Sequence, residues 1–106
     1  MAGASNELHE PAERLGAQVV DVHRALVSIQ EELEAADWYN QRATASDDAE
    51  LAAILAHHRD EEKEHAAMLL EWVRRHDPAF DRHLHTYLFT EGSVTQIEHE
   101  AEHAQE

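Results

Sequence analysis

The sequence contains no cysteine, which rules out disulfide bonds and metal sites with thiolate ligands. Only three glycines and two prolines occur among 106 residues, so few points interrupt the secondary structure. No apolar run approaches the roughly 18 residues of a membrane span. A composition with so few breaks predicts a small number of long elements, and helices are the natural choice.

Basic residues are also scarce, with 8 Lys and Arg against 23 Asp and Glu and a formal net charge of -15. This charge repels phosphate backbones and anionic lipids, so we expect neither nucleic acid nor membrane as a partner. Cations are the expected ligands, and they would be bound by carboxylates and the ten histidines. The N-terminal stretch MAGASNELHEP lacks the basic and apolar regions of a signal peptide, which predicts a cytoplasmic protein.

Three helices are predicted, over residues 11–42, 48–76 and 78–90. Pro11 suits the first position of a helix. Asp47 and Glu50 have the spacing of a capping box for the second helix. Asp77 followed by Pro78 predicts a capped third helix. Residues 1–92 are therefore expected to form one helical domain.

Residues 93–106 are polar and acidic and are expected to form a disordered tail. Within them, residues 99–103 match the H-E-x-x-H pattern of zinc proteases. The match is interpreted as accidental, because it lacks an apolar face, a third ligand downstream and a domain that would form a cleft. Adventitious metal binding is the better interpretation of this motif.

Apolar residues of the first helix are spaced by three and four, as in a long helix packed along its length. They are Leu15, Val19, Val22, Leu26, Ile29, Leu33 and Ala36. The second helix continues the pattern with polar residues in its centre: Leu51, Leu55, His58, Glu62, His65, Leu69 and Trp72. A two-helix hairpin would leave much of each stripe facing water, so we expect an all-α hairpin with a short C-terminal helix that dimerises into a four-helix bundle.

Glu62 and His65 are three residues apart and share one face of the second helix. Glu32 lies near the middle of the first helix, which faces the middle of the second in an antiparallel hairpin. Di-iron bundles take a glutamate from each of two helices and Glu-x-x-His from the other two. One chain holds half of this set, so two copies would hold two metal ions. Iron fits the oxygen and nitrogen donors, with manganese, zinc and calcium as possible occupants.

Other interpretations of these residues remain open. A charge-rich run such as DEEKEH is often a solvated helix face, and EELE is often acidic helix surface. The central polar residues would then serve a non-redox divalent-metal-binding oligomer, or a structural dimer in which they set helix register. Substitution of Glu32, Glu62 or His65 by alanine separates these functions: an enzyme loses oxidation, a carrier loses binding, and a structural module can even gain stability.

The chain resembles the encapsulated ferritins, a ferritin-like family carried as cargo inside encapsulin nanocompartments. The resemblance rests on EELEAADWYNQR, LAAILAHHRDEEKEHAAMLLEW and TYLFTEG, and extends from about residue 10 to residue 92. It implies dimers joined in a ring-shaped decamer, with a ferroxidase site between subunits that oxidises Fe(II) with dioxygen. The resemblance implies that the ferroxidase ligands are Glu32, Glu62 and His65. It also implies that Glu31 and Glu34 form a metal entry site.

The resemblance further implies that Trp38 and Tyr39 lie close to the iron path, although packing and an interface hydroxyl are simpler roles for them. It also implies an encapsulin shell partner that stores the oxidised iron. Family members usually end in an encapsulin-targeting extension, and none follows Glu106, so a truncated chain is expected and a cargo role rests on analogy. Independently, Glu31, Glu34 and Trp38 form a second stripe at i, i+3 and i+7, which suits a hairpin that dimerises twice into a ring.

Overall fold

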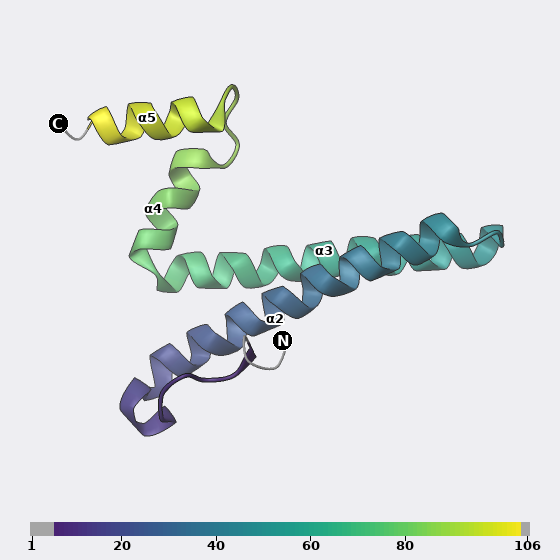
Figure 1. Ribbon diagram of the computed structural model, residues 1–106, viewed down its shortest axis with the longest axis horizontal. Helices are drawn as coiled ribbons and strands as arrows, with labels where there is room; N and C mark the ends of the chain where they lie inside the picture. The colour runs from purple at the N-terminus through teal and green to yellow at the C-terminus, as the bar shows by residue number, and fades with distance from the viewer. Residues whose placement is uncertain (1–5, 105–106) are drawn as a thin grey trace. The chain divides into compact units, whose positions relative to one another are not determined.

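A computed structural model describes residues 6–104 of the chain. Its helices are α2 (Ala12–Ala45), α3 (Ala49–His76), α4 (Pro78–Tyr87) and α5 (Val94–Ala104) (Figure 1). No strand occurs among the described residues, which confirms the predicted all-α class. Within the same residues, no helix combines the length and the apolar character that crossing a bilayer requires.

The chain divides into two compact units, one ending at Val73 and the other beginning at Arg74. The first unit contains α2 and nearly all of α3, and the second contains α4 and α5. The prediction of one domain over residues 1–92 stays a prediction, and the two units are described separately below.

Helices α2 and α3 lie side by side and run antiparallel (Figure 1). Near the turn, Arg59 Nη1 on α3 donates a hydrogen bond of 3.0 Å to Asn40 Oδ1 on α2. Further from the turn, Glu32 on α2 lies beside His65 on α3. With increasing distance from the turn, the contacting residues have lower numbers on α2 and higher numbers on α3. The predicted antiparallel hairpin requires this order.

The interior of this hairpin is narrow. Its buried residues are small: Ala25, Ala36, Ala66 and Val73. Three members of the predicted α2 stripe, Val19, Leu26 and Leu33, are instead exposed. Small side chains let two helices approach closely, and a pair of helices covers only one face of each. The expectation that a single hairpin leaves apolar stripes facing solvent is therefore confirmed.

The side-chain cap at the start of α3 lies one residue later than predicted. Asp48 Oδ1, rather than the Asp47 side chain, accepts a hydrogen bond of 2.8 Å from the backbone N–H of Leu51. Ser46 Oγ also accepts from the backbone N–H of Asp48, at 3.2 Å. The Ser46 hydroxyl thus holds the backbone that enters α3. Because Asp48 provides the cap, the predicted capping box from Asp47 to Glu50 is wrong by one position.

Helix α2 is interrupted near its start by Gly16, with φ 83° and ψ 165°. This left-handed φ is readily available only to glycine, and it kinks the helix. The predicted uninterrupted helix over residues 11–42 missed this break. Helix α2 also extends to Ala45, three residues beyond its predicted end.

In the second unit, α4 begins as predicted. Asp77 Oδ1 accepts from the backbone N–H of Phe80 at 3.0 Å, and Pro78 is the first helical residue. The helix ends at Tyr87 rather than near residue 90, because Leu88 is extended and Phe89 has a φ of 59°.

Residues Val94–Ala104 form the helix α5, where the sequence was expected to give a disordered tail. Ser93 Oγ accepts a hydrogen bond of 3.3 Å from the backbone N–H of Gln96 and so caps the helix. The Gln96 amide then donates to Glu100 at 3.3 Å, one turn on. Helices α4 and α5 contact each other. This local bonding and packing explain why the polar composition misled the prediction for these residues.

Candidate metal centre

Three polar side chains meet in the middle of the α2–α3 hairpin. Glu32 comes from α2, and Glu62 and His65 come from α3. One ligand atom from each lies within 4.8 Å of the other two. His65 Nδ1 is 3.5 Å from Glu32 Oε2 and 3.8 Å from Glu62 Oε2.

The helical repeat explains why these side chains converge. Glu32 lies four residues before the buried Ala36, and Glu62 lies four residues before the buried Ala66. Each carboxylate therefore takes a place in the stripe that faces the opposite helix. His65 follows Glu62 by three residues and shares its side of α3. The small alanines beside them keep the helices close enough for all three to reach one point.

The cluster is partly shielded from water. The side chains of Glu32 and Glu62 are 24% and 23% exposed, and that of His65 is 45% exposed. Glu32 Oε2 is buried and has no hydrogen-bond partner among residues 6–104. A buried carboxylate oxygen without a partner costs roughly 1–3 kcal/mol or more, because its lost hydration is not replaced.

The spacing of the three ligand atoms is compatible with binding of one ion. The His65–Glu32 and His65–Glu62 distances of 3.5 and 3.8 Å exceed normal hydrogen-bond lengths. Two ligands of one ion lie at most about 4.4 Å apart when each bond is about 2.0–2.2 Å. Two carboxylates and one imidazole suit Fe(II), Mn(II) or Zn(II). The orphaned Glu32 oxygen and this donor set fit a divalent transition-metal ion.

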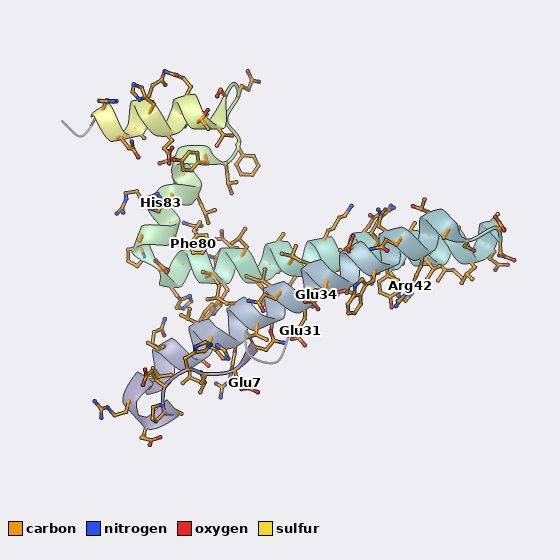
Figure 2. The ribbon with its side chains drawn as sticks, viewed as in Figure 1. Glu7, Glu31, Glu34, Arg42, Phe80 and His83 are labelled. Carbon is orange, nitrogen blue, oxygen red and sulfur yellow. The ribbon has the colours of Figure 1, made fainter. Side chains whose placement is uncertain are left out.

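Glu31, Glu34 and Trp38 are not part of this cluster. All three are exposed on α2, and Figure 2 shows the two glutamates along the middle of that helix. Their helical phase differs from that of Glu32, as the predicted second stripe required. Their suggested role where metal enters stays a prediction.

Tyr39 lies seven residues after Glu32, two turns along the same side of α2. Its ring centroid is 5.2 Å from that of His58 on α3, and the Arg42 guanidinium carbon lies 5.4 Å from it. A cation over an aromatic face is favourable. Tyr39 therefore has a packing role in the hairpin, and its predicted nearness to an iron path stays a prediction.

Sequence reasoning overlooked Arg59, a cation on α3 three residues before Glu62 and next to His58 of the predicted stripe. Besides its bond to Asn40, its Nε donates to Asp60 Oδ1 at 2.9 Å. This hydrogen bond from the guanidinium lowers the pKa of the Asp60 carboxyl below its usual value. Arg59 could have been recognised from the sequence because it lies three residues before Glu62, where a charged side chain needs a partner.

Comparison with known proteins agrees with the observed helical fold. Residues 7–91 match the EncFtn-like family. This chain belongs to that family. The cluster of Glu32, Glu62 and His65 lies inside the matched region.

Relatives of this EncFtn-like chain include the encapsulated ferritin-like protein of Rhodospirillum rubrum, 64% identical over 98 residues, which are 92% of this chain and 70% of the relative. The encapsulin nanocompartment cargo protein EncC of Myxococcus xanthus is 42% identical over 52 residues, 49% of this chain and 40% of EncC. A crystal structure of a Nitrosomonas europaea protein has a TM-score of 0.78 and 61% identity, covering 82% of this chain and 96% of that one.

Proposed function

We propose that this protein is a ferroxidase that oxidises Fe(II) to Fe(III) with dioxygen at a site shared by two copies of the chain. The observation that carries this proposal is the convergence of Glu32, Glu62 and His65, with a buried Glu32 oxygen that lacks a hydrogen-bond partner in the described chain. Iron is the substrate at this site. The similarity to encapsulated ferritin-like proteins supports the choice of iron.

One chain supplies two carboxylates and one imidazole, which is half of the ligand set of a bundle-type di-iron site. A second copy related by a two-fold axis completes the set with four carboxylates and two imidazoles. The four carboxylates then balance the charge of two Fe(II) ions. The two ions give two electrons, which dioxygen takes up together with two protons.

The surface around the cluster suits a second chain. Leu33, next to Glu32, is 56% exposed, and Met68, one turn after His65, is 65% exposed. Apolar side chains gathered beside a polar cluster are typical of an interface between protein copies. Dimers of this kind assemble further into a ring-shaped decamer, with the exposed stripe of Glu31, Glu34 and Trp38 on a second interface.

The oxidised iron is stored inside an encapsulin nanocompartment, whose shell protein is the partner of the assembly. Similarity to a protein described as encapsulin nanocompartment cargo supports this partner.

The test compares Glu62→Gln with the matched control Glu64→Gln, since Glu64 is exposed on the same helix. Both variants remove one charge and keep the side-chain shape. Fe(II) is added without oxygen, air is admitted, and ferric absorbance and oligomer mass are followed. The wild type and Glu64→Gln should oxidise iron rapidly, whereas Glu62→Gln should be slower by about 100-fold or more, since even outer-shell changes cost 10–100-fold.

Equal rates in all three proteins would overturn the proposal. Tight Fe(II) binding by the wild type without faster oxidation would instead identify a non-redox metal-binding oligomer. Circular dichroism of each variant is the control for an unchanged helical content.

A further inference from the structure

A pair of histidines on α5 is a second place where imidazoles converge. His99 and His103 are four residues apart, and their ring centroids are 4.1 Å apart with an angle of 60° between the ring planes. Both residues are exposed. Residues at i and i+4 share one side of a helix, so an ion approaching from solvent can reach both rings.

The helical backbone of α5 holds the two histidines at this spacing. Ser93 caps α5, and Gln96 hydrogen-bonds to Glu100 across one turn of it. The histidines occupy the last two turns of an 11-residue helix. In a disordered tail the same residues would have to be ordered at an entropic cost before they chelated an ion. The formed helix therefore favours joint binding by both imidazoles.

The charge around the pair also favours a cation. Helix α5 carries Glu98, Glu100 and Glu102, and the sequence has no lysine or arginine after Arg82. Glu100 lies three residues before His103, on the adjoining part of the same side. A cation is attracted to this segment, and no basic side chain of the segment competes for its carboxylates.

We propose that His99 and His103 form a binding site for one divalent transition-metal ion, such as Zn²⁺ or Cu²⁺, that is separate from the Glu32, Glu62 and His65 cluster. Each imidazole supplies one nitrogen at about 2.0–2.1 Å, and water completes the coordination. Cu²⁺ binds more tightly than Zn²⁺, because nitrogen ligands generally have a higher affinity for Cu²⁺. The site binds metal without hydrolysing peptides, because no third acidic or histidine ligand joins the pair within residues 6–104.

The test is chemical footprinting of the full chain with Zn²⁺ as the probe. Diethyl pyrocarbonate modifies free imidazoles, and peptide mass spectrometry measures the modification of each histidine separately. All measurements are made in the Glu62→Gln background, so that zinc binding at the proposed ferroxidase site does not affect the result. Zn²⁺ should protect His99 and His103 together, while His83 and His85 serve as internal references.

The decisive variant is the double substitution His103→Ala with Ala101→His. It keeps the number of histidines but places the pair two residues apart, on different sides of the helix. Protection of His99 should then need at least about 10-fold more Zn²⁺, because the gain from two linked ligands is lost. His103→Gln, with a good helix former, should show the same loss and guards against an effect of helix disruption.

Equal zinc dependence in the wild-type pair and the spacing variant would overturn the proposal, since it would mean that single imidazoles bind independently. Modification of His99 that Zn²⁺ does not reduce in the parent protein would overturn it as well.

Discussion

His65 Nδ1 lies 3.5 Å from Glu32 Oε2, across the two helices of the hairpin. The distance is too long for a hydrogen bond and leaves the Glu32 oxygen without one among the described residues. A carboxylate in that position is unfavourable for the folded chain alone and favourable once a cation arrives.

Replacing Glu32 by leucine should stabilise the metal-free protein. The change removes a buried oxygen that has no hydrogen-bond partner among residues 6–104 and adds apolar contact, so the free energy of unfolding should rise by about 1–3 kcal/mol. Urea unfolding in the presence of a chelator measures it. Glu31→Leu, at an exposed neighbour, is the matched control and should change stability by less than about 0.5 kcal/mol. A less stable Glu32→Leu protein would show that the carboxylate already has a favourable partner.

Metal should stabilise the wild type through this cluster. An ion that binds only the folded state raises the free energy of unfolding by about 2.7 kcal/mol at 100 times its dissociation constant. Calorimetry with Fe(II) under nitrogen should therefore show a higher Tm for the wild type and little change for His65→Ala. The same Tm increase in both proteins would place the stabilising ion elsewhere.

Asp48→Ala should destabilise the hairpin by about 0.5–2 kcal/mol, because the first turn of α3 loses its side-chain cap. Asp47→Ala removes the same charge one residue earlier and should cost much less. Chemical unfolding of the two variants gives the comparison directly. If Asp47→Ala were the more damaging change, the cap would lie where the spacing of Asp47 and Glu50 first placed it.

Asn40→Ala should lower the free energy of unfolding, since it leaves the Arg59 guanidinium without its acceptor on the opposite helix. The neighbouring Gln41 donates a hydrogen bond of 3.0 Å to Asp37 on its own helix, so Gln41→Ala removes no link between the helices and should cost less. Because the Asn40–Arg59 bond links the helices two turns from Glu32, Asn40→Ala should also weaken Fe(II) binding. Unchanged stability and binding would show that the alanine packing alone sets the register.

The pKa of Asp60 should lie below the usual value of about 3.9 for an aspartate and return toward it in Arg59→Met, which removes the hydrogen bond from the guanidinium. Since the folded-state pKa is lowered, any stability from this pair is present above pH ~3.9 and is lost as the pH falls through the folded-state value. Carbon-detected NMR titration of the side chain measures both values. A pKa that is identical with and without Arg59 would contradict the assignment.

The parts of the fold that follow from strong local chemistry were predictable. Asp77 and Pro78 mark a helix start unambiguously, and the Glu62–His65 spacing placed two ligands on one face. Their meeting with Glu32 followed from antiparallel pairing alone.

Other features depended on small energy differences. Asp47 and Asp48 are both good caps, and only the Ser46 hydroxyl decides between them. Gly16 could have been tolerated inside a helix, at a cost of about 1 kcal/mol relative to alanine, so its left-handed φ was not evident from the sequence. Helix α5 forms through a serine cap and one glutamine bond, and polar composition outweighed both in the sequence-based prediction.

The small side chains inside the hairpin also affect how the protein responds to dilution. Ala25, Ala36 and Ala66 bring the helices together but remove little apolar surface from water, while Leu33 and Met68 remain exposed. Burial of apolar surface contributes about 25 cal/mol per Å², so a single chain that leaves these side chains exposed lacks much of the stabilisation that their burial would give. If two copies of the chain associate as proposed, folding and association become one equilibrium, and the Tm should rise with protein concentration.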